Sequence, residues 1–133
     1  MLVFCGASPE KHSQASAQKT PLNTAQPDDG ANLYIRYCLS CHQKDGSGVP
    51  NMYPPIQNSD WVNGDKNKLI KVLLNGLEGD IEVNGDQYNQ VMPKQNALTD
   101  AQIALLLTYI RQNFGNKASA VDPADVAKLR EKK

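Results

Sequence analysis

The feature that most constrains this chain is the stretch YCLSCHQ at residues 37–43. In it two cysteines stand two residues apart and a histidine follows at once. The whole chain has only three cysteines and two histidines in 133 residues. Three kinds of site use a Cys-x-x-Cys pair, namely zinc centres, thiol–disulfide exchangers and covalent haem. The surroundings of Cys38, Cys41 and His42 therefore decide which chemistry the chain supports.

Two of these three sites fit the sequence poorly. A zinc centre needs four ligands, usually from two such pairs, and the remaining Cys5 and His12 lie in a polar N-terminal segment that makes no second half-site. A thiol–disulfide exchanger carries the pair at the start of a helix that follows a strand. Here the pair comes at the end of a predicted helix with no strand before it.

Cys-x-x-Cys-His is the attachment signal for c-type haem. Two thiols at this spacing reach the two vinyl groups on one edge of a porphyrin, and His42 then lies under the iron and can bind it. The predicted domain has 86 residues between positions 30 and 115, and a core that small usually needs a further stabilising element. The motif therefore predicts one haem c, bonded through Cys38 and Cys41.

The second axial position of the iron decides between electron transfer and chemistry on a bound ligand. The candidate ligands are Met52, Met92 and His12. Met52 follows His42 by only ten residues, so its loop would have to double back. Met92 follows His42 by 50 residues, which is enough chain to round the ring, and Pro93 restricts it to extended backbone. A lone methionine is otherwise core filler. Given a haem, we favour Met92 as the ligand.

The alternative is a haem enzyme or gas sensor with an open sixth coordination site. Such a site needs an acid–base group on the open side of the iron. Apart from His42, the only histidine is His12, and Arg111 lies on the last long predicted helix, away from the loop that carries Met92. We therefore predict an electron carrier rather than an enzyme, with no catalytic residues.

Composition separates three segments. Residues 1–27 begin with MLVFC and continue with Ser, Ala, Gln, Pro and Thr without periodicity, which predicts a truncated signal or lipoprotein start and a disordered tether. Cys5 is either the lipid-modified cysteine of a lipoprotein or a free thiol near the terminus. Residues 28–115 form the predicted haem domain, and residues 116–133 form a C-terminal extension with a short helix. No apolar run approaches the roughly 20 residues needed to cross a bilayer.

Helical periodicity and capping signals predict a mostly helical domain. The net charge is zero, from 14 basic and 14 acidic residues, and shows no nucleic-acid footprint. Asn84-Gly85 predicts a type I′ hairpin, and Thr99 with Gln102 predicts a capping box. The predicted elements are helices at 30–38, 65–76, 98–115 and 122–133 and a hairpin within 80–88.

Together, CLSCH, MYPPI, Trp61, YNQVMP and LTDAQIALLLTYIR resemble a class I c-type cytochrome over about residues 28–115. The segment NGLEGDIEVNGDQYNQVMP is similar to a subgroup with a hairpin before the methionine. That subgroup includes the cytochrome domains of quinoprotein dehydrogenases, nitrite reductases and oxidases. The resemblance implies an all-α, cytochrome c-like fold around one covalent haem, with a small β-hairpin insertion.

The resemblance also implies a function and a location. A single-haem cytochrome with His/Met-ligated iron cycles between Fe(II) and Fe(III) and carries electrons between membrane or periplasmic redox partners. The partners implied are a dehydrogenase, a reductase or a terminal oxidase, met by a monomer. We expect a periplasmic protein, either free or tethered to the membrane as a lipoprotein through Cys5.

Further roles around the haem follow from the resemblance alone. Pro54 stands twelve residues after His42, where the family has a proline whose carbonyl accepts a hydrogen bond from the ligand's free ring nitrogen. Such a bond fixes the tautomer and makes the ligand a better donor, and Pro55 is the competing candidate. Trp61 and Tyr88 are expected either to donate to a haem propionate or to pack in the core and the hairpin.

The resemblance includes one helix contact and one departure. Gly30 and Tyr34, with Leu106 and Tyr109, match the family's contact between the first and last helices, where the glycine permits a close crossing. Gln43 stands where the family commonly has a glycine just after the histidine. The departure concerns the fine packing beside His42.

Overall fold

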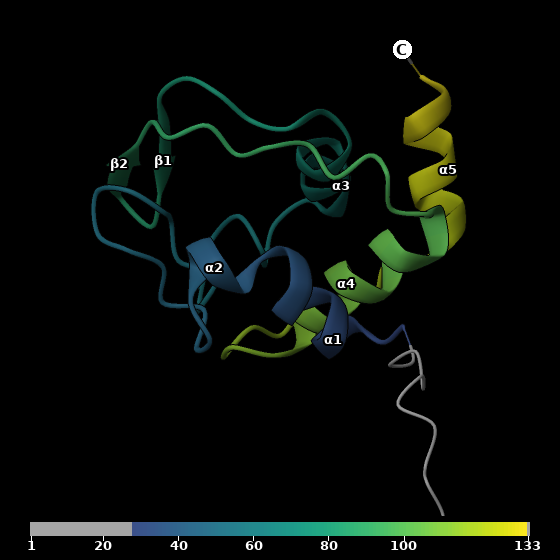
Figure 1. The fold of residues 1–133 in the computed structure, drawn as a ribbon, viewed down its shortest axis with the longest axis horizontal. Coiled ribbons are helices and arrows are strands. Elements are labelled where there is room, and N and C mark those ends of the chain that lie inside the picture. The colour runs from purple at the N-terminus through teal and green to yellow at the C-terminus, as the bar shows by residue number, and fades with distance from the viewer. Residues whose placement is uncertain (1–27, 133) are drawn as a thin grey trace, which may run out of the picture.

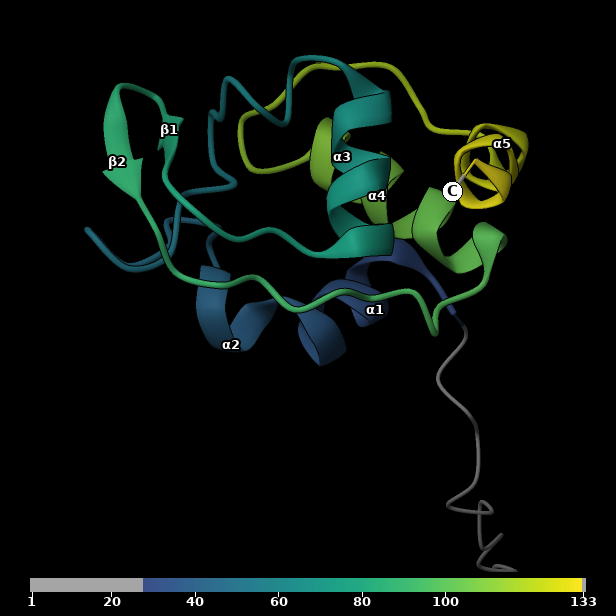
Figure 2. The same ribbon diagram turned by 90° about the horizontal axis from the view of Figure 1, so that it is seen from above.

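The computed structural model describes residues 28–132, so the predictions for Cys5, His12 and the tether lie outside the described residues. The order of elements is α1 (Gly30–Tyr37), α2 (Leu39–His42), α3 (Lys66–Asn75), β1 (Ile81–Val83), β2 (Asp86–Tyr88), α4 (Asp100–Gln112) and α5 (Pro123–Glu131). The hairpin and α5 lie at opposite ends of the molecule, with α3 and α4 between them (Figures 1 and 2). This arrangement confirms a mostly helical chain with one small hairpin.

None of the helices in residues 28–132 is long and apolar enough to cross a membrane. Four of the helices begin at a capping residue, and Asp29 serves α1. A cap side chain accepts a hydrogen bond from a backbone N–H of the first turn, which otherwise has no partner inside the helix. The capping residues are Asp29, Asp65, Thr99 and Asp122.

Two helices end earlier than the sequence predicts. The first was expected to run through Cys38, but α1 ends at Tyr37 and Cys38 has φ −124°, so the rest of the motif forms the separate short helix α2. The helix expected to reach Gly115 ends at Gln112, because the next residue is extended and Phe114 adopts φ 57°. There the Phe114 ring packs against Tyr34, with centroids 4.9 Å apart, so tertiary packing overrides the glycine stop signal.

The crossing of α1 and α4 confirms the contact expected for Gly30. A Cβ atom on Gly30 would lie 2.5 Å from the carbonyl oxygen of Leu105, so any larger residue would push the helices apart. The Tyr34 and Tyr109 rings lie beside this crossing, with centroids 6.2 Å apart. Leu106 is fully buried in the core next to it. The crossing fixes α1, and therefore the start of the Cys-x-x-Cys-His motif, relative to α4.

The hairpin forms as predicted. Val83 pairs with Asp86, and Asn84 and Gly85 have φ values of 51° and 87°, which is the left-handed pair that a type I′ turn requires. The turn is also attached to the loop before α3, because the Asp60 carboxylate accepts from the Asn84 N–H at 3.1 Å. The Asn84 side chain accepts from the Asp60 N–H at 2.9 Å in return. The hairpin therefore moves with the loop that carries Trp61.

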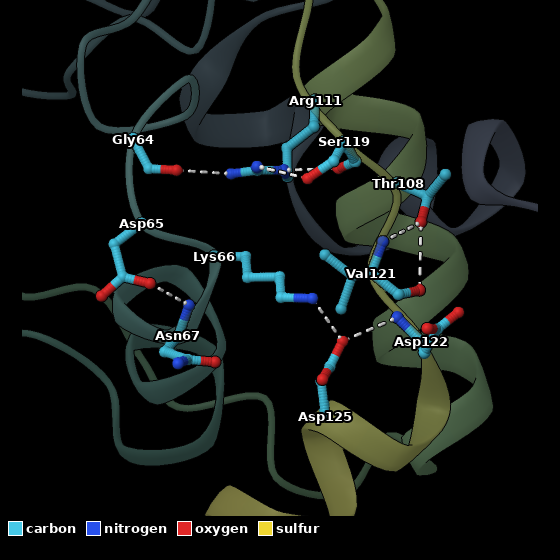
Figure 3. Close-up of polar contacts among 10 residues, drawn as sticks. All are labelled: Gly64, Asp65, Lys66, Asn67, Thr108, Arg111, Ser119, Val121, Asp122 and Asp125. Carbon is cyan, nitrogen blue, oxygen red and sulfur yellow. Dashed lines mark hydrogen bonds and ion pairs between the residues drawn. The ribbon is translucent and has the colours of Figure 1, made fainter.

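Residues 116–132 pack onto the body of the domain. Val126 is fully buried and Leu129 packs against the same core. Polar contacts reinforce the docking: the Val121 N–H donates to the Thr108 hydroxyl at 2.9 Å, and Lys66 forms an ion pair with Asp125 at 2.8 Å (Figure 3). The C-terminal helix α5 thus lies against both α3 and α4.

Candidate haem-binding site

An apolar cavity lies among α2, α3, β1 and α4. Cys38 and His42 line one side of it, and its walls are mostly aliphatic and proline side chains. The wall residues include Ile56, Val62, Leu69, Leu73, Leu107 and Ile110. The cavity therefore suits a large apolar group that is held next to the motif.

A second cavity is lined by Cys41 together with residues of the hairpin and the loop after it. His42 and Met92 line both cavities, so the two predicted iron ligands border the same space. Cys38 borders the first cavity and Cys41 the second. The residues present therefore fit a flat apolar cofactor bonded to both cysteines, with one ligand from the motif and another from the later loop.

His42 is oriented by a hydrogen bond to a backbone carbonyl. Its Nδ1 lies 2.8 Å from the carbonyl oxygen of Pro54, so the acceptor is Pro54 rather than Pro55. A carbonyl only accepts, so Nδ1 carries the proton and Nε2 keeps the lone pair that a metal requires. Burial lowers the pKa of His42, and the bond to Pro54 opposes that shift only in part. The imidazole is therefore held in the neutral form and in the tautomer suited to binding iron.

The two motif cysteines are free thiols in different environments. Cys38 is buried, and this burial, with the nearby Cys41, raises the pKa of its thiol to about 12. Cysteines that exchange disulfides have lowered pKa values instead, so Cys38 does not match an exchanger. Within residues 28–132 no cluster of three or more His, Cys, Asp or Glu side chains could hold a metal ion. Among these described residues the motif gains no further ligands of the kind a zinc centre needs.

Met92 is half-buried, and its backbone pairs with that of Leu77, which lies just after the end of α3. Its N–H donates to the Leu77 carbonyl at 2.8 Å, and the Leu77 N–H donates to the Met92 carbonyl at 3.0 Å. Gly76 permits this approach, because a Cβ there would lie 2.8 Å from the Met92 oxygen. Met52, in contrast, is 44% exposed and lines only the second cavity. The geometry favours Met92 over Met52 as the residue that faces His42.

Trp61 and Tyr88 both border the cavities, but the Trp61 donor is already engaged. Its indole N–H donates to the Glu82 carbonyl at 2.7 Å, and Lys68 Nζ lies 3.5 Å from the centre of the ring. The indole N–H is thus used within the protein instead of being left for a propionate, and the ring lines the first cavity. Tyr88 is buried in β2, lines the second cavity and pairs with Ile81 of β1.

Arg111 is a buried cation to which the sequence gave no role. The residue is 4% exposed, and its guanidinium donates to the Val62 carbonyl at 2.9 Å. It also donates to the Gly64 carbonyl at 2.9 Å and to the Ser119 carbonyl at 2.8 Å (Figure 3). Burial lowers its pKa, while the charge of Asp65 opposes that shift. The side chain ties the cavity wall at Val62 to α4. The only signal in the sequence for a buried Arg111 was its position one turn after Leu107, on the apolar face of the helix predicted at 98–115.

Comparison with known proteins agrees with this geometry. The family model described as Cytochrome c matches residues 27–114. Cytochrome c-552 of Thermus thermophilus is 40% identical over 114 residues, covering 79% of this chain and 86% of that protein. The cytochrome c subunit of alcohol dehydrogenase (quinone) from Gluconacetobacter polyoxogenes is 37% identical over 106 residues, covering 77% of this chain but 22% of the subunit.

A third relative shows the same partial coverage. The cytochrome c subunit of gluconate 2-dehydrogenase from Pantoea cypripedii is 36% identical over 110 residues, covering 76% of this chain and 24% of the subunit. The chain therefore spans most of the length of the Thermus protein, but less than a quarter of the two dehydrogenase subunits.

Proposed function

Because the chain belongs to the cytochrome c family and carries haem c on Cys38 and Cys41, we propose that it is a single-haem electron carrier with iron ligated by His42 and Met92. When bound, the haem accepts and releases one electron as its iron alternates between Fe(II) and Fe(III). The observation that carries the proposal is that His42 and Met92 border the same two cavities beside the cysteines.

The protein's residues contribute three properties to such a carrier. The Pro54 carbonyl, 2.8 Å from Nδ1 of His42, keeps the proton on Nδ1 and the lone pair on Nε2, and makes the ring a better donor. The thioether of Met92 favours the ferrous state and so raises the reduction potential. The aliphatic walls act in the same direction, because they disfavour the extra charge of ferric iron. Because both axial ligands would stay bound to Fe(II) and to Fe(III), electron transfer would need little structural rearrangement.

The residues around the cavities favour this role over an open-site enzyme or sensor. Neither cavity is lined by a carboxylate, lysine or arginine side chain from residues 28–132. An enzyme that works on an iron-bound ligand needs an acid–base group placed beside that ligand. The proposed function is therefore electron transfer without catalysis by the chain itself.

We propose that its partners are redox proteins, one donor and one acceptor, which it meets as a monomer. The names of two relatives suggest a dehydrogenase as donor, and the acceptor would be a reductase or terminal oxidase. Beside the second cavity, Val91 is 64% and Met52 is 44% exposed, next to the half-buried Cys41. This edge suits the small, transient contact typical of electron-transfer complexes.

We further propose a periplasmic location, because haem is attached to Cys-x-x-Cys-His outside the cytoplasmic membrane. Cys5 is the candidate anchor for a lipoprotein form. Replacing Cys5 with serine in cells would move the protein from the membrane fraction to the soluble periplasmic fraction if Cys5 carries the lipid. An unchanged distribution would remove the anchor from the proposal.

A reaction with carbon monoxide separates the carrier from the open-site alternative. The purified, reduced holoprotein is mixed with carbon monoxide, and a potentiometric titration of the same sample follows the haem absorbance. We expect one reversible one-electron step and very slow carbon monoxide binding, because Met92 occupies the sixth position. Rapid carbon monoxide binding in the folded protein would reject the proposal and favour an enzyme or sensor.

A further inference from the structure

A residue of α5 contacts the backbone that leads away from Met92. Nη1 of Arg130 donates to the Asn96 carbonyl at 2.9 Å and Nη2 donates to the Leu98 carbonyl at 2.7 Å. Its Nε donates to the Asp100 carboxylate at 2.7 Å. One planar guanidinium thus holds two carbonyls and the first residue of α4 together, which a single-point ammonium cannot do.

We call residues 89–99 the ligand loop, since they carry Met92 from β2 to α4. Figure 2 shows this segment running along the molecule to the start of α4, and Figure 1 shows that α5 stands beside that end. Near Met92 the loop pairs through its backbone with Leu77, two residues after the end of α3. It is attached to α3 itself by the Gln95 N–H, which donates to the Leu73 carbonyl at 2.6 Å. Arg130 supplies the attachment at the far end.

The ligand loop has little apolar burial to hold it in place. Leu98 is its only buried residue, at 4% exposed, while Met92 and Gln95 are half-buried and the other positions are exposed. A segment with few buried contacts opens locally at lower free energy than the core does. Its polar attachments therefore account for a large share of its resistance to opening.

We propose that Arg130 is a positioning residue for the axial ligand: by holding the far end of the ligand loop, it slows the local opening that withdraws Met92 from the iron. This inference rests on the proposed function, in which Met92 is the sixth ligand. Arg130 lies outside residues 27–114, the part of the chain matched by the family model. The C-terminal helix thus takes part in the coordination of the haem without touching the cavity.

The same helix offers a matched control. Lys66 forms an ion pair with Asp125 of α5 at 2.8 Å, with the two side chains 35% and 23% exposed. The pair of Arg130 and Asp100 is similar, at 2.7 Å and with side chains 34% and 36% exposed. The Lys66 pair joins α5 to α3 and does not touch the ligand loop. Lys66→Gln therefore loosens α5 without removing the attachment of the loop.

The experiment measures how fast imidazole replaces the sulfur ligand in the full-length ferric holoprotein. At saturating imidazole, loss of the sulfur–iron(III) charge-transfer band reports the opening rate. For Arg130→Gln we expect an opening about tenfold faster than in the parent protein, equivalent to about 1.4 kcal/mol. The opening rate of Arg130→Lys should lie between those of the parent protein and Arg130→Gln, because lysine keeps the positive charge but lacks the planar set of N–H donors. Lys66→Gln should stay within about twofold of the parent protein.

Hydrogen exchange gives a second readout that does not depend on the iron. The hydrogen-bonded amides of Met92, Gln95 and Leu98 should lose protection in Arg130→Gln while those of α1 keep theirs. Equal imidazole rates for Arg130→Gln and Lys66→Gln, or a uniform loss of protection along the chain, would overturn the role of Arg130. Absence of the sulfur band in the parent protein would instead overturn the assignment of Met92, which distinguishes the two failures.

Discussion

The residue after His42 is strained, and removing the strain should stabilise the protein. Gln43 has φ 68° and ψ 163°, a region of backbone space that is essentially restricted to glycine. It is held there by its N–H, which donates to the Leu39 carbonyl at 2.9 Å, and by its carbonyl, which accepts from the Tyr34 hydroxyl at 2.6 Å. Strain of this kind costs on the order of 1–3 kcal/mol.

Gln43→Gly keeps both backbone contacts and removes the Cβ atom that causes the strain. The gain is reduced because glycine gives the unfolded chain more freedom, which costs about 0.4–1 kcal/mol. We therefore expect a net stabilisation of about 1 kcal/mol, which corresponds to a rise in melting temperature of roughly 4 °C for a domain of this size. A glycine is also what the family commonly has at this position.

The assay is thermal and urea unfolding of the holoprotein, followed by far-ultraviolet circular dichroism. Gln43→Ala is the matched control, since it shortens the side chain but keeps Cβ, and it should not exceed the parent protein in stability. A Gln43→Gly protein that melts at or below the temperature of the parent, or no higher than the alanine variant, would refute the argument from backbone strain.

Three further changes test the packing and the charges. Gly30→Ala should lower the free energy of unfolding in urea by about 2 kcal/mol, because its Cβ would meet the Leu105 carbonyl; an unchanged midpoint would contradict the close crossing. Arg111→Met should cost about 3 kcal/mol in the same assay, because it leaves buried carbonyls without a donor, and a neutral effect would contradict that accounting. The hydrogen bond from Lys66 lowers the pKa of Asp125 in the folded protein. The ionised carboxylate therefore stabilises the fold at pH values above the ordinary pKa of about 3.9. This stabilisation is lost as the pH falls through the lower pKa of the folded state. Asp125→Asn should therefore be less stable than the parent at pH 7, with the difference in melting temperature vanishing below that folded value; a difference constant with pH would contradict the assignment.

Local signals explain most of what the sequence predicted. The capping box at Thr99 and the turn at Asn84-Gly85 each depend on residues within a few positions of one another. Their chemistry can therefore be identified without a fold. The contact of His42 with Pro54 spans twelve residues and came from the family resemblance, not from local chemistry.

The features that the sequence did not predict depend on contacts between distant segments. Trp61 donates to Glu82, 21 positions later, only because the hairpin turn is bonded to the loop before α3. Arg111 reaches a loop 47–49 positions earlier, and Arg130 reaches carbonyls 32 and 34 positions earlier. No short pattern encodes which carbonyl a long cationic side chain will meet. The strain at Gln43 likewise follows from the fixed positions of Leu39 and Tyr34 on either side of it.

Iron ligation by Met92 is tested by the absorption spectra of the oxidised holoprotein and of two methionine variants. The parent protein should show the weak charge-transfer band of a sulfur–iron(III) bond. Met92→Ala should lose that band, and Met52→Ala, altered at the more exposed methionine beside the second cavity, should keep it. A Met92→Ala spectrum identical to that of the parent, or loss of the band in Met52→Ala alone, would contradict iron ligation by His42 and Met92.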